Sequence, residues 1–475
     1  MLALCKQLFD FLNQQNIGYC HWKSNERLEE ALSGKTDLDL LIHRDDEKAF
    51  QAALSTYDFK CVLSQPDKQF PGLEDYLGFD AATGKLIHLH VHYRLVLGQK
   101  YIKNHHLPLE LLIFENLARK LGVNIPCPEI ELILLIIRAH LKTDLISLAK
   151  HAIQGVLGKR YTAFPRDIED ELRELHQRSD PQKFSQLLQD SGLPLSESWC
   201  NQFLERLSKD RLRFYNIMLG HYTILRQLRP YRRNTNIGVY LSYFRHFVLN
   251  LPFVRRIRSP KRKTLMGPGK VFSIVGADGS GKSSLIQDLN KWLSWKLTVK
   301  KYYYGIPKNS ISALSSLLIR IFKKLGLRSM ASSVGDLFWL YVAKHRKLVS
   351  DMIMQDIDES KVVLTDRFPL RDFRIMEEPM DNPRIDASKT LLGKNLRELE
   401  EKYYNDIQCP DRIFMLQVDF DELRRRKTDI ALDKHQTKAA AVNSIADKDP
   451  VILINANRPY DEVLLEVKNL IWQAL

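Results

Sequence analysis

The sequence predicts an α/β protein, on three observations. An apolar run of strand length at 271–275 is followed by a glycine-rich turn and a helical pattern. Near the N-terminus, strand-like runs at 37–43 and 86–97 alternate with helical segments. From 128 to 153, apolar residues recur at helical spacing. The 475 residues are enough for two or three domains, and we place these at 1–125, 126–265 and 266–475.

The composition is that of a globular protein, with 44% hydrophobic and 27% charged residues. Six scattered cysteines without a CxxC pair indicate reduced thiols, so we expect a cytoplasmic protein rather than a disulfide framework. The first fifteen residues predict an amphipathic helix, not a signal peptide. The apolar stretch 130–137 stops at Arg138, so we expect a buried helix there, and no run is long enough for a membrane span.

The positive charge is concentrated in the middle of the chain. The net charge is +14, and residues 211–270 alone carry fourteen lysines and arginines with no acidic residue. Within this segment, 236–263 joins an apolar-aromatic stretch to a cationic tail. Three interpretations stay open: an interfacial helix on an anionic membrane surface, phosphate contacts with nucleic acid, or a packed helix with a solvated linker. No base-reading motif is present, which argues against nucleic acid.

The C-terminal part contains a phosphate-binding pattern, "GADGSGKS", that fits G-x-x-x-x-G-K-[ST] between a strand and a helix. Glycines allow consecutive backbone N–H groups to surround a phosphate, and the helix N-terminus adds partial positive charge. Lys282 would neutralise the β- and γ-phosphates of ATP, and the Ser283 hydroxyl would bind Mg²⁺. The predicted nucleotide-binding residues are Gly276, Asp278, Gly279, Ser280, Gly281, Lys282, Ser283 and Ser284.

A second strand-like run, "KVVLTD", ends at Asp366 and Arg367. Strand carboxyl ends line the crevice of open α/β sheets, so Asp366 could hold Mg²⁺ through water and Arg367 could bind a phosphate. The simpler alternative is an acidic–basic pair at the surface.

These segments, together with "PDRIFMLQVDFDELRRRK" and "VILINANRPYDEV", resemble the successive motifs of the thymidylate kinase family of P-loop nucleoside-monophosphate kinases. The resemblance covers about 268–475. It implies a parallel sheet flanked by helices, ATP and Mg²⁺ as cofactors, and in-line transfer of a phosphoryl group. It would place Asp278 against the acceptor, Asn457 near adenine, and the transition-state arginines of a mobile lid at Arg424, Arg425 and Arg426. A solvated helix face is the alternative for these arginines.

The acceptor side differs from that family. Where the family has a Glu-Pro-Gly stretch, this chain reads "KKYYYGIPKNS" at 300–310. We therefore expect ATP as the donor and do not carry thymidylate over as the acceptor.

The N-terminal region contains Asp37 and Asp39, two apart on a strand-like run and therefore on one face. Paired carboxylates are suited to divalent metal. Ser24, separated from Asp37 by twelve residues, completes a pattern that resembles the nucleotidyltransferase superfamily of DNA polymerase β. The resemblance implies that Ser24 contacts a triphosphate and that the two aspartates bind metal. Lys23 stands where that superfamily has glycine, and an acidic strand end in solvent is the alternative.

The segment "LIHLHVHYR" places His88, His90 and His92 on one face of a predicted strand. By the same resemblance, this strand supplies a third carboxylate, and His90 occupies its position. His90 could therefore join Asp37 and Asp39 on a metal, or the site could have lost its chemistry. Ordinary strand histidines beside polar neighbours are the third possibility.

The sequence as a whole predicts an ATP-dependent kinase for a small acceptor, with an N-terminal nucleotidyltransferase-like domain. By resemblance to bacterial proteins with this pairing of domains, we lean toward surface-polysaccharide assembly. Two alternatives stay open: a nucleotide-sensing scaffold that docks on the inner face of a membrane, and a polynucleotide kinase. An oligomer is compatible with the sequence.

Overall fold

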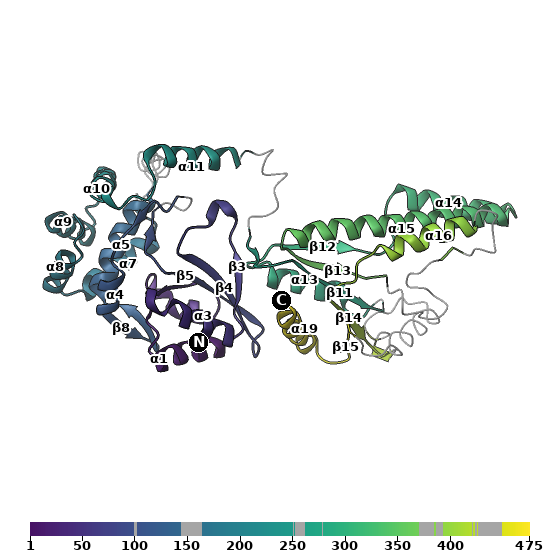
Figure 1. Ribbon diagram of the computed structural model, residues 1–475, viewed down its shortest axis with the longest axis horizontal. Coiled ribbons are helices and arrows are strands. Elements are labelled where there is room, and N and C mark those ends of the chain that lie inside the picture. The colour runs from purple at the N-terminus through teal and green to yellow at the C-terminus, as the bar shows by residue number, and fades with distance from the viewer. Residues whose placement is uncertain are drawn as a thin grey trace. The chain divides into compact units, whose positions relative to one another are not determined.

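The structure, a computed structural model, describes residues 1–98, 102–143, 164–249, 251, 262–277, 279–369, 384–385, 393–419, 421–422, 425 and 449–475. The chain divides into two compact units, 1–261 and 262–475, each with its own core (Figure 1). Within the described residues, none of the helices combines the length and apolar character needed to cross a membrane.

The first unit is built on a mixed sheet in the strand order β1-β2-β5-β4-β3, in which β2 and β5 are parallel and the other pairs antiparallel. Its main elements are α1 (Ala3–Gln14), β1 (Tyr19–His21), α2 (Leu28–Leu32), β2 (Leu38–Ile42), α3 (Glu47–Thr56), β3 (Lys60–Leu63), β4 (Leu73–Asp80), β5 (Lys85–His92), β6 (Val96–Leu97), β7 (His105–His106), α4 (Glu110–Glu115), β8 (Leu117–Lys120), β9 (Val123–Pro126), α5 (Pro128–Lys142), α7 (Arg166–Arg178), α8 (Pro181–Asp190), α9 (Glu197–Ser208), α10 (Phe214–Gln227) and α11 (Asn236–Leu249).

The two faces of this sheet belong to different cores because side chains alternate along each strand. Leu38, Leu40 and Ile42 of β2 pack in one core with α1 and α3, whereas Leu41 packs in the other with α5. The second core also holds residues of α7, α8, α9 and α10. The segment predicted as a separate connector, 126–265, therefore divides differently: its helices up to α10 share a core with the N-terminal sheet. The reason is that α5 is buried on all sides and needs cover from both directions.

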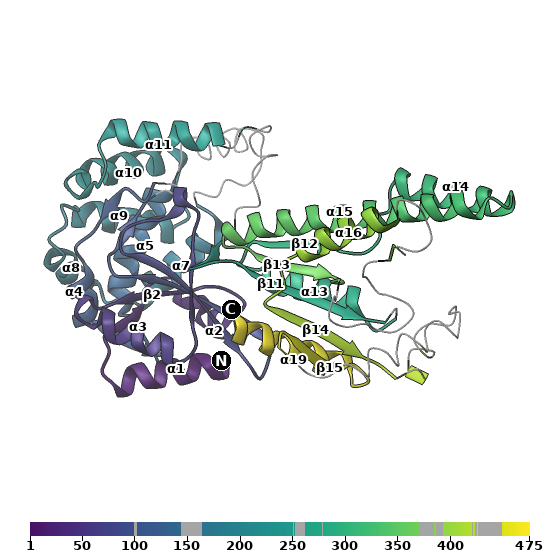
Figure 2. The same cartoon turned by 45° about the vertical axis from the view of Figure 1, so that its right-hand side comes forward.

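The second unit has a five-stranded, wholly parallel sheet in the order β12-β13-β11-β14-β15. Helices α13 and α19 lie on one side of it and α15 on the other (Figures 1 and 2). This is the predicted α/β fold, a parallel sheet flanked by helices. Its elements are β10 (Thr264–Leu265), β11 (Lys270–Gly276), α13 (Lys282–Leu293), β12 (Val299–Tyr303), α14 (Ser310–Lys324), α15 (Arg328–Asp358), β13 (Val362–Asp366), α16 (Gly393–Asn405), β14 (Arg412–Gln417), β15 (Val451–Asn455) and α19 (Tyr460–Ala474).

The start of α1 is held by a carboxylate from β4. Asp80 accepts hydrogen bonds from the Leu4 N–H at 3.1 Å, from the Thr83 N–H at 3.0 Å and from the Thr83 hydroxyl at 2.9 Å. Burial alone would raise the pKa of Asp80, but these hydrogen bonds outweigh it and lower the pKa below its usual value. The ionised carboxylate therefore satisfies backbone donors that the helix leaves unpaired.

We expect Asp80→Asn to lower the free energy of unfolding at pH 7 by about 1–3 kcal/mol, because the amide loses the charge and one acceptor. The folded-state pKa lies below the unfolded one, so the stabilisation is complete above about pH 4 and is lost as the pH falls through the folded pKa. Urea unfolding at several pH values measures the difference. Asp10→Asn, on an exposed position of α1, is the matched control and should change little. A deficit that persists unchanged in acid would contradict this account.

Candidate functional site

The glycine-rich turn between β11 and α13 has the backbone conformation that the sequence predicts. Gly279 and Gly281 have φ values of 93° and 92°, and α13 begins at Lys282 directly after Gly281. At Gly276, a Cβ atom would lie 2.8 Å from the Ser280 Oγ and 3.0 Å from a backbone carbonyl of β14. Only glycine fits these positions, so the residue types are required by the shape of the loop. Asp278 itself lies outside the described residues.

Polar groups of this loop are turned inward. The Lys282 ammonium is buried and donates to the Ala277 carbonyl at 2.6 Å. Ser280 is 3% exposed, and its hydroxyl has no hydrogen-bond partner in the described part of the chain. Ser283 and Ser284 lie at the exposed first turn of α13. A phosphate in the loop would supply acceptors for these groups.

The neighbouring strand β13 ends beside the loop at the predicted Asp366 and Arg367. Asp366 is in register with Ile274 of β11, and one of its buried carboxylate oxygens lacks a hydrogen-bond partner among the described residues. Arg367 has a left-handed φ of 71°, and its N–H donates to the Ile274 carbonyl at 3.0 Å. Such a conformation is uncommon outside glycine and is typical of functional sites.

A cavity of about 570 Å³ opens beside the loop. Of the predicted residues it is lined by Gly279, Ser280, Gly281 and Ser284 of the loop segment and by Arg425 and Asn457, which are far apart in the sequence. Arg425 is exposed and pairs with Glu422 at 3.0 Å. Asn457 accepts from the Asp419 N–H at 2.9 Å. Arg424 and Arg426 lie outside the described residues.

Three polar side chains that line this cavity are not among the predicted site residues: Glu422, Arg458 and Tyr460. The Tyr460 hydroxyl donates to Asp288 at 2.6 Å, which ties the start of α19 to the helix that follows the phosphate loop. Burial, together with Asp288, raises the pKa of Tyr460. The proline before Tyr460 marks a helix start, and this is the one signal that could have placed the tyrosine at the site.

The three tyrosines that depart from the kinase pattern have different surroundings. The Tyr302 hydroxyl donates to Asp356 at 2.6 Å, and Tyr304 is buried. The Tyr304 carbonyl accepts from the buried Arg346 of α15 at 2.8 Å. Tyr303 is 41% exposed and in register with Asp366. Tyr303 is therefore the exposed tyrosine of the three, and it lies beside the carboxyl end of β13.

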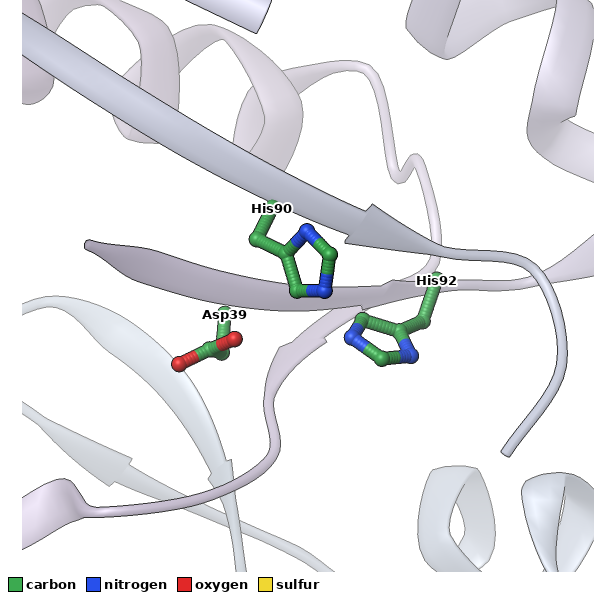
Figure 3. Close-up of side chains that lie close together, drawn as sticks. All are labelled: Asp39, His90 and His92. Atoms are coloured by element: carbon green, nitrogen blue, oxygen red, sulfur yellow. The ribbon is translucent and has the colours of Figure 1, made fainter. Parts of the chain in front are cut away.

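The first unit carries a separate polar site on the face of its sheet toward α5. Strand pairing places Asp39 of β2, His90 of β5 and Asp75 of β4 in one row across three adjacent strands. The His90 Nδ1 lies 2.9 Å from an Asp75 oxygen. In Figure 3, Asp39, His90 and His92 project into one space, and their ligand atoms lie within 4.8 Å of one another.

The remaining predicted residues of this region have other partners. His88 lies 3.0 Å from Asp75 through Nε2 and 3.0 Å from Asp37 through Nδ1. Asp37 thus lies with His88, outside the Asp39–His90–His92 cluster. Ser24 lies in the turn that follows β1 and has a left-handed φ of 58°. The left-handed residue of this turn is therefore the serine itself, with Lys23 before it.

Two lysines flank the cluster. The Lys23 ammonium lies 2.6 Å from Asp39, and the Lys103 ammonium lies 3.3 Å from the His90 Nε2. Burial would raise the pKa of Asp39, but Lys23 and His90 lower it below its usual value. Burial, with a smaller effect of Lys23, lowers the pKa of Lys103 to about 7. Burial also lowers the pKa of His90 and brings that of His92 well below its usual value.

Asp75 is the acidic residue that sequence reasoning missed. By the resemblance, His90 stands in place of a carboxylate on the strand 86–94, and the structure places a carboxylate, Asp75, on the antiparallel neighbour β4, directly beside His90. No local pattern marks Asp75, because the pairing of β4 with β5 decides which of its side chains meet the histidines. Lys103 lies in the segment before β7 and reaches His90 only through the fold, so no local pattern marks it either.

The comparisons with known proteins are limited in range. No model of a protein family matches the sequence. The chain is 26% identical to the "Uncharacterized ATP-binding protein YghR" of Escherichia coli strain K12, over 42% of this chain and 84% of that one. It is 28% identical to the "Uncharacterized ATP-binding protein YghS" of the same strain, over 42% and 90%. The thymidylate kinase of Candida albicans matches in structure with a TM-score of 0.28 and 17% identity, over 43% of this chain and 92% of that one.

A buried glutamate close to Ser24 makes the first unit sensitive to pH. Glu131 of α5 is 4% exposed and accepts from the Asn25 amide at 2.7 Å. Burial raises the pKa of Glu131 to about 7, although the Asn25 hydrogen bonds oppose this. The folded state therefore binds a proton that the unfolded state releases, and this contribution to stability is lost as the pH rises through about 7.

We expect Glu131→Gln to be more stable than the wild type at pH 8.5, by on the order of 2–3 kcal/mol, and to match it near pH 5. The amide keeps an acceptor for Asn25 and carries no charge to bury. Thermal or urea unfolding across this pH range measures the gap, and Glu30→Gln, exposed on α2, is the control. If Glu131→Gln were less stable at every pH, the ionised carboxylate would be a stabilising group and this interpretation would be wrong.

Proposed function

We propose that the second unit transfers a phosphoryl group from ATP to a small acceptor. The observation that supports this best is the 570 Å³ cavity that joins the phosphate loop to Arg425 and Asn457. A nucleotide has an anionic end and a planar apolar end, and this cavity offers a loop of backbone donors at one side and the β15–α19 turn at the other. The two E. coli relatives are named as ATP-binding proteins, which agrees with this proposal.

In this proposal, different groups of the second unit have different roles in binding the phosphates. The loop N–H groups and Lys282 would bind the β- and γ-phosphates, and Arg367 would face the acceptor side of the γ-phosphate. Arg425 lies on the exposed segment near Asn457 and could reach the transferred group by leaving its ion pair with Glu422. These roles need only charge and position, as phosphoryl transfer does in general.

Mg²⁺ fits the same site. The Asp366 oxygen without a partner among the described residues is an acceptor of the kind that Mg²⁺ prefers, and the exposed Ser283 hydroxyl opens the helix that follows the loop. When bound, Mg²⁺ would neutralise charge on the phosphates. Asp366, with Ser283, would hold it in place.

The acceptor is proposed as a sugar or a nucleoside monophosphate. Tyr303 supplies an exposed ring beside Asp366, and a ring of this kind can stack on a base or a sugar face. A role in bacterial surface-polysaccharide assembly fits a sugar acceptor. For a polynucleotide acceptor, single-stranded DNA would compete with the acceptor in a strongly salt-dependent manner.

The test measures ADP formation and phosphorylated product by the full chain with a panel of sugars and nucleoside monophosphates. Lys282→Ala should lower kcat by about 100-fold or more, because it removes charge stabilisation from the transferred group. Asp366→Asn should raise the Mg²⁺ concentration that gives half-maximal rate. Lys291→Ala, exposed on the same helix, is the control and should turn over ATP like the wild type.

Two outcomes would contradict the proposal. Equal ATP turnover by Lys282→Ala and the wild type with every acceptor would refute the kinase proposal. Tight ATP binding without turnover would favour the nucleotide-sensing scaffold.

A second proposal is that the first unit docks on an anionic membrane surface through α10 and α11. The α11 residues Ile237, Tyr240, Leu241 and Phe244 are 62–72% exposed at helical spacing. Tyr215, Leu219 and Tyr222 of α10 are exposed as well. The surrounding sequence is rich in arginine and lysine and lacks acidic residues, which matches an anionic lipid partner. The predicted cationic tail at 252–261 lies outside the described residues.

Sedimentation with phosphatidylglycerol vesicles tests this surface. The wild type should sediment with these vesicles and not with phosphatidylcholine vesicles, and high salt should weaken the binding. The double variant Leu241→Asp and Phe244→Asp should bind at least about tenfold more weakly, because each apolar side chain contributes about 1.5–3 kcal/mol on burial. Leu111→Asp, exposed on α4, is the matched control. Unchanged sedimentation of the double variant would exclude α11 as the contact.

A further inference from the structure

We propose that Asp39, His90 and His92 form a binding site for a single divalent transition-metal ion such as Zn²⁺, Mn²⁺ or Co²⁺. The site lies in the first unit and is independent of the proposed kinase chemistry. It differs from the carboxylate site that the sequence predicts, since two of its three ligands are imidazoles and Asp37 is not among them.

The three side chains lie close enough together to enclose one metal ion after a small adjustment. Their ligand atoms lie within 4.8 Å of one another, and they come from neighbouring strands whose register is fixed by hydrogen bonding. Imidazole nitrogen and carboxylate oxygen bind such metals at about 2.0–2.2 Å, so ligand atoms around a tetrahedral ion are about 3.3–3.6 Å apart. The side chains must therefore move closer together, by about 1 Å, when the ion binds.

His92 points to a missing ligand. Its side chain is 1% exposed, and neither ring nitrogen makes a hydrogen bond of normal geometry in the part of the chain that the structure describes, although the Arg94 backbone interacts with the ring. Its ring lies against His90 and Trp22, with centroids 4.6 and 5.0 Å away. A buried polar group without a partner is costly, and such groups call for an unseen ligand or ion. A metal ion in the cluster would use one of these nitrogens.

His90 is prepared for the same role by Asp75. A carboxylate can only accept, so the contact of 2.9 Å requires the hydrogen of His90 to be on Nδ1. In the neutral ring, Nε2 then carries the lone pair, and it is this atom that faces Lys103. A ligating histidine whose other nitrogen donates to a carboxylate is the usual arrangement around protein-bound metals.

The two lysines mark the place of a cation. Lys23 lies against Asp39 and Lys103 against the His90 Nε2, so each ammonium contacts an atom that the metal would bind. A metal ion must displace both. The displaced ammonium groups would then flank the ion, where they favour an anionic fourth ligand such as a phosphate group.

The ligand set also indicates which metal binds. Two imidazoles and one carboxylate suit borderline ions, whereas Mg²⁺ prefers oxygen ligands and keeps most of its water. Three protein ligands leave a coordination position open, as in catalytic rather than structural metal sites.

The experiment titrates the chelator-treated full chain with Co²⁺, followed by visible absorption and calorimetry, and then competes it with Zn²⁺ or Mg²⁺. We expect one Co²⁺ per chain, without the intense charge-transfer band of thiolate ligands, displaced by Zn²⁺ and not by millimolar Mg²⁺. Asp39→Asn and His92→Gln should each weaken binding at least about 30-fold. Lys103→Met removes a competing charge and should tighten binding about tenfold.

Two controls define the site. His106→Gln changes a half-exposed histidine on β7 and should bind Co²⁺ like the wild type. His88→Gln keeps a donor for Asp75 and should also retain binding, which separates this site from one made by the three histidines. Absence of Co²⁺ binding by the wild type, or wild-type binding by Asp39→Asn and His92→Gln, would overturn the proposal. If these two variants fail to fold, Lys103→Met decides, because unchanged or weaker binding by it contradicts the displaced-lysine geometry.

Discussion

The strict alternation of side chains along β-strands is the constraint on which both candidate sites depend. In β5, Leu89 and Val91 enter the core beneath α1 and α3, so His90 and His92 must face the opposite side. A shift of one residue would turn the histidines into that apolar core and turn Leu89 and Val91 toward the polar cluster on the other face. In β11 the same rule places Phe272 and Val275 on opposite sides of the sheet. The apolar residues that stabilise each sheet therefore also fix which polar side chains reach its functional face.

Local features of this chain could be predicted from sequence, and non-local ones could not. The strand, phosphate loop and helix at 270–293 lie within one continuous segment, and their residue types follow from backbone geometry alone. Buried helix α5 was predicted because its apolar run is continuous. What could not be predicted is which unit covers α5, because an apolar surface does not specify its partner. The structure divides into two compact units, 1–261 and 262–475, and the helices up to α10 share a core with the N-terminal sheet.

The N-terminal site shows the same limit in more detail. Spacing along the chain placed Asp39 and the three histidines on single faces of their strands. The parallel pairing of β2 with β5 and the antiparallel pairing of β4 with β5 then decide which residues become neighbours. Asp75 enters the row only through the second pairing. Its presence changes the role of His90, from a residue that replaces an acid to one that is oriented by an acid on the next strand.

The two sites differ in how their charges are arranged, and this difference determines which ligands each site favours. The phosphate loop relies on backbone dipoles and one lysine, so it is suited to a ligand with large negative charge. The strand site alternates charges of opposite sign, with Lys23 beside Asp39 and Asp75 beside His90. The positive and negative charges of this site therefore nearly cancel when no ligand is bound. A dication alone would leave Lys23 and Lys103 uncompensated beside it, since both lose their partners when the metal binds. A dication that arrives with an anionic group restores the balance, so the electrostatics favour the metal and an anion together over either one alone.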